Sequence, residues 1–295
     1  MKLVLLLLAL SILLAFPATA QEAEVGLYIL NLGKFDVATG SFTADFYLSM
    51  KCDEGCTPDF EFMNGRAVSV DRIIDEPDER FYRILANLNS PVDLRRFPFD
   101  RQQMQVIIED KRQQADVITY APAIQESGID KSIAFTGWRI DGWRAEQREH
   151  AYPLYNETYS QYVFSVDISR IPFNSFLKTF LPVLFIVLIV MFTYIMDPDK
   201  ISSRLTVASS SLIAAVMFHI SIANQIPPTG YLTTADKFMI LTYLFLLATI
   251  ILNVLLLELH ELKRMELAEK IHRRTEYAVF VAVPIIYLLF FIIVL

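Results

Sequence analysis

The sequence lacks the short motifs on which most enzymes depend. It contains no glycine-rich phosphate loop, no His-Glu-x-x-His zinc motif and no Gly-x-Ser-x-Gly nucleophile motif, and its four histidines are far apart. Catalysis and metal binding need such side chains in one constellation. We therefore expect no catalytic residues, no metal site and no cofactor, which disfavours an enzyme.

Positive charge is in deficit, with 26 Lys and Arg against 33 Asp and Glu and a formal net charge of −7. The excess of acidic residues falls between residues 21 and 171. A surface of this sign enriches cations around itself and repels the phosphate backbone of nucleic acids. Nucleic acid is therefore excluded as a partner on charge grounds.

Formal charge is absent altogether from four long segments, 181–196, 205–226, 238–257 and 277–295. A helix needs about 20 predominantly apolar residues to cross a bilayer. These segments predict an all-α four-helix transmembrane bundle over residues 172–295. We place its helices at about 174–196, 203–226, 236–258 and 276–295, with a cytoplasmic loop at about 259–275.

The first 20 residues follow the pattern of a secretory signal peptide. Lys2 precedes an apolar run from Leu3 to Phe16, and small residues lead up to Ala20. The domain that follows is then exported, and four spans return the C-terminus to the same side. Basic residues in the 259–275 segment agree, because they favour the cytoplasmic face. We expect a multi-pass plasma-membrane protein with both ends periplasmic or extracellular.

Cysteine is nearly missing, since Cys52 and Cys56 are the only two in the chain. Both fall in the exported part, where the compartment is oxidising. Their spacing favours a small turn closed by a disulfide. Free thiols, or half of a metal site, are the alternatives.

Alternating apolar and polar residues run through the exported part, 21–171. They occur at 42–50, 82–88, 104–108 and 162–168, and turn residues separate them. A period of two residues is typical of half-buried strands, and several short strands with turns between them favour a sandwich. We predict an all-β antiparallel sandwich of the immunoglobulin-like type, used for sensing or binding.

Polar side chains interrupt the second uncharged segment in a regular way. Steps of three or four residues place one set on a single helix face: Ser202, Thr206, Ser210, Ile213, Met217, Ile220, Ser221 and Asn224. Copies of this face in a ring would line a pore, with a dewetting constriction at Ile213 and Met217. Alternatively, the hydroxyls bond to neighbouring helices. His219 lies off this face, either as a packed, hydrogen-bonded residue or as a group that titrates between about pH 5 and 7.

Several motifs in order resemble one receptor family. Residues 90–104, with Phe97-Pro98-Phe99-Asp100 at their centre, resemble the loop that names the Cys-loop receptors, the pentameric ligand-gated ion channels. Ser90 and Met104 replace the bracketing cysteines, as in the prokaryotic branch. The segment 58–64, Arg170, Pro182 and Pro227 match other family positions. The resemblance implies a homopentamer in a prokaryotic inner membrane.

The resemblance also implies which residues couple the exported domain to the pore. Phe97, Pro98 and Phe99 would press onto a turn that contains Pro227, Pro228 and Tyr231, while Asp36 and Asp100 would pair with Arg170. Such a pair is suited to switching, or to holding the two parts statically in register.

The sequence gives weaker evidence for a ligand-binding site than for the pore. Tyr152, Tyr155 and Tyr159 fall where the family has its capping loop, and Phe60, Phe62 and Tyr82 come from other strands. Aromatic faces at a subunit interface can hold an amine by cation–π attraction. The alternative is that the phenylalanines are sandwich core and the tyrosines a strand edge. Cys56 replaces the tryptophan usual in the family, and the chain before Pro58 is short, so both changes affect the usual agonist pocket.

The sequence thus predicts a subunit of a ligand-gated ion channel that conducts passively, with cations favoured by the acidic exported domain. Its partners are further copies of itself, membrane lipid, inorganic ions and a stimulus that is a small molecule, a proton or Ca²⁺. The acidic turn Asp75–Glu79 is a candidate for the last two, or a solvated loop. The alternative function is a non-conducting, membrane-anchored binding or sensor protein.

Overall fold

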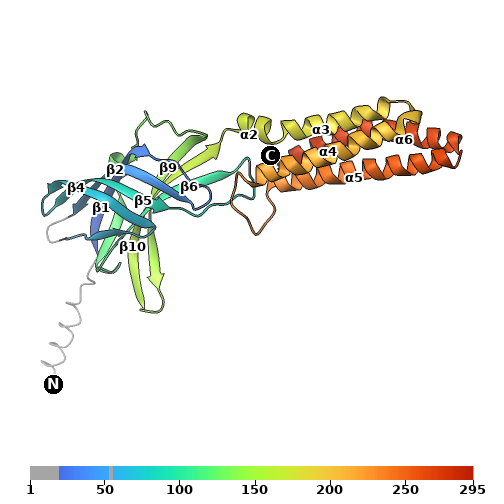
Figure 1. Cartoon of the computed structure of the whole chain (residues 1–295). Coiled ribbons are helices and arrows are strands. Elements are labelled where there is room, and N and C mark those ends of the chain that lie inside the picture. The colour runs from blue at the N-terminus through green and yellow to red at the C-terminus, as the bar shows by residue number, and fades with distance from the viewer. Residues whose placement is uncertain (1–19, 53–55, 295) are drawn as a thin grey trace, which may run out of the picture. The chain divides into compact units, whose positions relative to one another are not determined.

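The computed structural model describes residues 20–52 and 56–294, which form two compact units (Figure 1). The first unit comprises residues up to Pro91 together with 103–136 and 140–168, and the second comprises 92–102, 137–139 and 169–294. The predicted signal peptide lies, apart from Ala20, outside the described residues.

The first unit is a β-sandwich. One sheet has the order β4-β5-β2-β1-β7, with β8 paired to β1, and the other has the order β3-β6-β10-β9. The first sheet consists of β1 (Gln21–Leu32), β2 (Ser41–Cys52), β4 (Gly65–Asp75), β5 (Glu79–Asn89), β7 (Ile118–Pro122) and β8 (Gly128–Ile129). The second consists of β3 (Phe60–Phe62), β6 (Arg101–Asp110), β9 (Trp138–Tyr152) and β10 (Glu157–Arg170), and a short helix, η1 (Ile124–Glu126), follows β7.

Alternation in the sequence predicted the core strands correctly. In β2 the residues Phe42, Ala44, Phe46, Leu48 and Met50 are buried, and the same alternation holds along most of β5 and β6, whereas β10 is buried continuously from Ser160 to Val166. Burial of each large apolar side chain contributes about 1.5–3 kcal/mol. The strands therefore form where alternate residues can be buried together between the sheets.

Two features of the sandwich differ from the sequence prediction. The first sheet is not purely antiparallel, because β1 pairs in parallel with β7 and β8. In addition, β4 has no buried residue and pairs with β5 through two irregularities, so it shows no alternation. Alternation reports which face of a strand is buried, and it carries no information on a strand's partner or direction.

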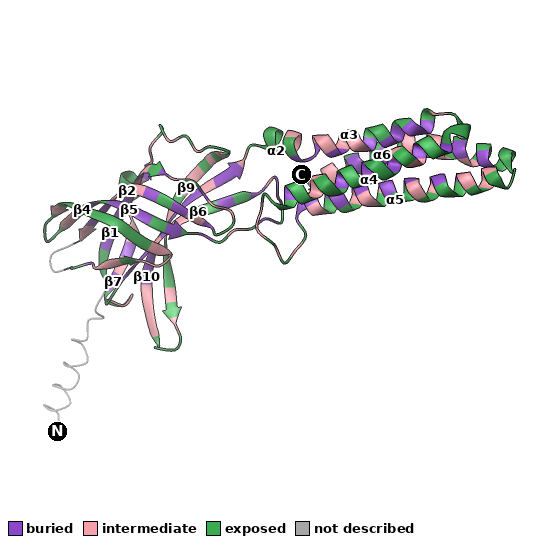
Figure 2. Ribbon diagram, in the orientation of Figure 1, coloured by how far each residue is buried: buried purple, intermediate pink, exposed green. Residues whose placement is uncertain are grey.

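The second unit is helical. Its elements are α2 (Pro172–Thr179), α3 (Leu181–Phe192), η2 (Thr193–Ile195), η3 (Pro198–Lys200), α4 (Ile201–Ala223), α5 (Thr234–Glu261) and α6 (Met265–Val294). Three of them, α4, α5 and α6, are long and apolar enough to cross a membrane. Figure 1 shows α3 to α6 running side by side, and their outward faces carry many exposed apolar residues (Figure 2).

The first predicted span, 174–196, is not one straight helix. It consists of α2 and the segment Leu181–Ile195, which meet at an angle of 44°, so the structure has a fourth span only if this bent pair counts as one. Pro182 lies in the first turn of α3. A proline lacks an N–H donor and clashes with the carbonyl four residues earlier, which is why the helix breaks there.

Most of the segment predicted as a cytoplasmic loop, 259–275, is helical. Helix α5 continues to Glu261 and α6 begins at Met265, so only residues 262–264 connect them. This segment is rich in Glu, Leu, Arg and Lys, which all have high helix propensity. The charge of the segment predicts a position outside the membrane, which stays a prediction, and charge does not show that the helices continue through the segment.

A close approach between strands makes Gly65 essential to the sandwich. A Cβ at this position would lie 2.1 Å from the carbonyl oxygen of Asn87 and 2.8 Å from the Cα of Leu88. Both are backbone atoms of the paired strand β5, which can move only by disturbing the sheet. We predict that Gly65→Ala lowers the free energy of unfolding by about 1–3 kcal/mol.

The measurement is thermal unfolding of the purified full-length protein in detergent, followed by near-ultraviolet circular dichroism. Gly142→Ala in β9 is the matched control, because no described atom lies within 4 Å of its added Cβ. Equal unfolding midpoints for the two variants would contradict the close contact.

Candidate functional site

Helix α4 has one packed face and one open face. Its buried residues are Ile201, Arg204, Ala208, Ser211, Ala215 and Ile222. The eight residues of the predicted stripe are all exposed: Ser202, Thr206, Ser210, Ile213, Met217, Ile220, Ser221 and Asn224. At about 100° per residue the two sets lie on opposite sides of the helix. The stripe is therefore free to face water or another subunit.

The permanent charge of α4 lies on its packed face. Arg204 is buried, and its Nη1 and Nη2 lie 3.0 Å and 3.4 Å from the two ring nitrogens of His272 in α6. Nε of Arg204 is buried and has no hydrogen-bond partner among the described residues. The guanidinium is thus directed away from the exposed stripe.

His219 is a packed, hydrogen-bonded residue, as the first of its two interpretations predicted. Its Nδ1 lies 2.9 Å from the hydroxyl of Tyr243, and its Nε2 lies 3.1 Å from Oδ1 of Asp236. The other carboxylate oxygen of Asp236 accepts the N–H and the hydroxyl of Thr233, which caps α5. The imidazole thereby links α4 to the first turn of α5.

A buried ion pair organises the loop 92–102. The carboxylate of Asp100 is fully buried and accepts hydrogen bonds from Nε of Arg170 at 2.7 Å and from Nε2 of Gln102 at 2.9 Å. The guanidinium carbon of Arg170 also lies 5.1 Å and 4.6 Å from the ring centroids of Phe97 and Trp138. The cation is held by one carboxylate and two aromatic faces.

The same loop contacts the start of α5 and the turn before it. The N–H groups of Thr234 and Ala235 donate to the carbonyls of Arg95 and Phe97, at 3.0 Å and 3.1 Å. The hydroxyl of Tyr231 accepts the N–H of Leu94 at 2.9 Å. These contacts satisfy donors that a helix N-terminus leaves unpaired, and they bring Phe97 and Tyr231, two of the predicted coupling residues, into one cluster.

For the remaining predicted coupling residues, the structure shows the contacts of some and tests the proposed role of none. Phe99 stacks on Phe180, with ring centroids 5.6 Å apart. Asp36 belongs to the first unit, where its carboxylate accepts hydrogen bonds from the N–H of Ala38 and the hydroxyl of Thr39. The pairing of Asp36 with Arg170, and the roles of Pro98, Pro227 and Pro228, stay predictions.

The six candidate ligand residues fall into two groups. Phe60 packs edge-on against Phe62 and Tyr82, at 5.8 Å and 5.5 Å between centroids, and Tyr82 is buried. In the second group Tyr152 and Tyr159 lie 5.7 Å apart, while Tyr155 is 68% exposed. No aromatic contact joins the two groups among the described residues.

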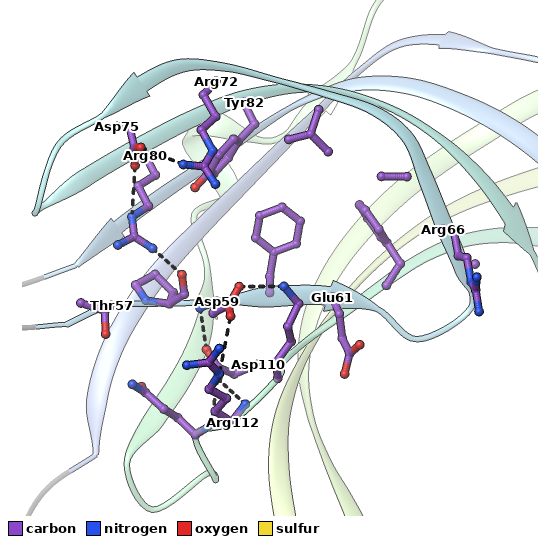
Figure 3. A pocket seen from close by; sticks show the side chains of 18 residues that line it. Thr57, Asp59, Glu61, Arg66, Arg72, Asp75, Arg80, Tyr82, Asp110 and Arg112 are labelled. Atoms are coloured by element: carbon purple, nitrogen blue, oxygen red, sulfur yellow. Dashed lines mark hydrogen bonds and ion pairs between the residues drawn. The ribbon is translucent and has the colours of Figure 1, made fainter.

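A cavity of about 1120 Å³ in the first unit has Phe60, Phe62 and Tyr82 in its wall (Figure 3). At one end Asp75 pairs with Arg72 at 3.1 Å and Arg80 at 3.8 Å. At the other, Asp59 pairs with Lys111 at 2.8 Å and Arg112 at 3.9 Å. Sequence reasoning missed these cations, because they come from segments far apart in the chain.

A second cavity, of about 480 Å³, was also missed. It lies over β1, β2 and β5, where Tyr47 stacks on Phe81 at 5.2 Å. The carboxylate of Glu126 accepts hydrogen bonds from Lys51 and, at 2.7 Å, from the hydroxyl of Ser49, and these bonds lower its pKa. Tyr47 is a polar-face residue of β2, which alternation could have identified as exposed but not as part of a cavity.

Cys52 and Cys56 form a disulfide, with Cα atoms 5.8 Å apart. Among the residues that the structure describes, no group of three or more His, Cys, Asp or Glu side chains could hold a metal ion. Within the acidic turn, Asp75 is already paired with two arginines. The described residues therefore give no support to a Ca²⁺ site at that turn.

The chain thus combines an all-β unit with a unit of membrane-length helices, one of which carries an open stripe of polar and apolar residues. No family model matches the chain. A proton-gated ion channel of Gloeobacter violaceus is 27% identical over 200 residues, covering 66% of this chain and 55% of the relative.

Two animal proteins are more distant relatives. Ligand-gated ion channel 50 of Caenorhabditis elegans is 21% identical over 70% of this chain and 44% of its own length. Neuronal acetylcholine receptor subunit alpha-10 of Rattus norvegicus is 21% identical over 57% of this chain and 38% of its own. The matched region spans about half or less of these relatives, which are named as channels or receptor subunits and not as enzymes. The chain is thus similar to ion channels and to an acetylcholine receptor subunit over 57–70% of its length.

The buried pair of Asp100 and Arg170 makes a prediction about stability. Arg170→Ala leaves a fully buried carboxylate without its counter-charge, which costs about 3–5 kcal/mol. Arg144→Ala is the matched control, because its pair with Asp167 at 2.7 Å is half-exposed and contributes about 0–1 kcal/mol. Denaturant unfolding of both variants in detergent compares the two losses, and similar losses would contradict the importance of the Asp100 pair.

Proposed function

We propose that this chain is the subunit of a homopentameric ligand-gated ion channel. An extracytoplasmic stimulus opens a pore lined by α4, and ions then move passively down their gradient. The single observation that carries the proposal is the open stripe on α4, opposite the face that packs on the rest of the bundle. The similarity to channels and receptor subunits supports it.

The stripe suits a pore for two physical reasons. Ser202, Thr206 and Ser210 place oxygen atoms at one end, and in a ring these oxygens replace part of an ion's hydration shell. Ile213 and Met217 are 65% and 63% exposed in the single chain, and a ring of such side chains gates by dewetting. A helix that served only as an anchor would need neither feature.

We propose that the channel prefers cations. Arg204, the one permanent charge of α4, is buried against His272 and does not lie on the stripe. The pore face then carries no positive ring from this helix. The acidic residues of the 21–171 region raise the local concentration of cations at the outer mouth.

The loop 92–102 is proposed as the coupling element, because it holds Arg170 through Asp100 and also contacts Tyr231 and the first turn of α5. A shift of this loop would reach α4 through the hydrogen bonds of His219 to α5. We place the protein in the inner membrane of a prokaryote, with the sandwich and the C-terminus outside the cytoplasm. Its stimulus is a proton, Ca²⁺ or a small molecule; the Gloeobacter relative is named proton-gated.

Reconstitution of the purified protein in planar bilayers tests conduction directly. Currents are recorded while pH, Ca²⁺ and a panel of amines are varied, and reversal potentials in asymmetric salt give the ion preference. We expect stimulus-dependent, cation-selective currents. Silence under every condition, with a known channel conducting in the same membranes, would instead favour a non-conducting sensor.

The pore face has its own test. Ile213→Ser wets the proposed constriction, so the channel should leak without a stimulus, and basal conductance should rise at least severalfold. Leu244→Ser in α5 is the control, because Leu244 is 60% exposed but lies on a different helix. A silent Ile213→Ser channel, or an equal leak in both variants, would count against this assignment of the helix face.

A further inference from the structure

A buried carboxylate lies in the second sheet of the sandwich, next to the candidate ligand residue Tyr152. The side chain of Glu109 in β6 is only 3% exposed. Its Oε2 lies 3.0 Å from Nδ1 of His150 and 2.8 Å from Nε2 of Gln161, and its Oε1 accepts the hydroxyl of Tyr152 at 3.0 Å. These three side chains come from the adjacent strands β9 and β10. One carboxylate therefore holds both arms of the β9–β10 hairpin to β6.

The hydrogen bonds of this cluster depend on whether the imidazole of His150 carries one proton or two. Nδ1 of His150 lies 3.0 Å from a carboxylate oxygen and 2.9 Å from the donor Nε2 of Gln161. If Nδ1 carries no hydrogen, its lone pair faces the carboxylate. If it carries one, it donates to Glu109, and a second proton on the ring then makes an ion pair. The side chain of His150 is 40% exposed, so water can deliver that proton.

The other groups around the imidazole cannot take this role. Tyr152 lies 4.3 Å from the His150 ring, and burial together with the carboxylate of Glu109 raises the pKa of its phenol to about 12, so it remains a donor. Glu61 in β3 is in register with Glu109 and adds negative charge, as does Glu157, which accepts the hydroxyl of Tyr159. Among the described groups bonded to Glu109, only His150 can become positive.

We infer that Glu109 and His150 form a proton-binding site that regulates the proposed channel by fastening the β9–β10 hairpin to β6. Acidification into the range where an imidazole charges turns a neutral hydrogen bond into an ion pair with a buried carboxylate. The ion pair therefore holds the hairpin more firmly than the neutral hydrogen bond does. The strand that it holds, β10, runs on to Arg170.

The regulatory part of this inference rests on the proposed function, whereas proton binding does not. The first experiment is therefore a nuclear magnetic resonance titration of the full-length protein in detergent, with ¹³C-labelled histidine rings. The chain has four histidines, and the signal missing in His150→Gln identifies His150. In Glu109→Gln the titration midpoint of His150 should move down relative to the unsubstituted protein, because the neighbouring negative charge is gone.

A midpoint that is equal in Glu109→Gln and in the unsubstituted protein overturns the site. Tyr152→Phe is the control for a general disturbance of the cluster. It removes one hydrogen-bond donor to Glu109 but keeps both Glu109 and His150. It should therefore leave the ion pair in place and shift the midpoint less than Glu109→Gln does. A larger shift in Tyr152→Phe also counts against the pair.

The second experiment records current against external pH in planar bilayers. His150→Gln keeps a donor for Glu109 but cannot charge, so the response between about pH 5 and 8 should be lost or moved by about one pH unit. His260→Gln is the control, since His260 lies in α5, 3.7 Å from Asp199. An unchanged pH response in His150→Gln overturns the regulatory inference, even if the first experiment shows a shifted midpoint. If no variant conducts at all, the proposed function fails, and the titration alone decides the proton site.

Discussion

The fully buried carboxylate of Asp100 sets the strongest constraint on the helical unit. A charge removed from water must be neutralised and hydrogen-bonded, and here Arg170 and Gln102 do this. Arg170 is the last residue of β10, two positions before α2 begins. The pair therefore fixes the point at which the chain enters the helices, and it holds the loop whose carbonyls accept the first N–H groups of α5.

Helix α4 follows a second constraint, because its two faces need different surroundings. The packed face holds Arg204 against His272, and His219 against Tyr243 and Asp236. These polar groups of α4 thus find hydrogen-bond partners within one chain, although Nε of Arg204 has none among the described residues. Those on the open face, such as Ser210 and Asn224, would be unfavourable in hydrocarbon. Association of several copies around water removes this conflict, and the proposed pore depends on that argument.

The sandwich uses carboxylates in two contrasting ways. Asp110 is buried and accepts the hydroxyl of Tyr120 and three backbone N–H groups, so it stabilises the fold without a cation. Glu109, the preceding residue, points to the other face of β6 and depends on His150. Neighbouring acidic residues therefore have different partners, because Asp110 is bonded mainly to backbone N–H groups and Glu109 to three side chains.

Local pattern in the sequence determined much of this protein: the strands β2, β5, β6 and β10, the length of the apolar helices and the stripe on α4 follow from periods of 2.0 and 3.6 residues. Tertiary structure decided the rest. The parallel pairing of β1 with β7, the burial of Arg204 against His272 and the bond between Glu109 and His150 join residues far apart in the chain. Periodicity tells which face of an element is buried. It does not tell which other element covers that face, and every buried charge here depends on that choice.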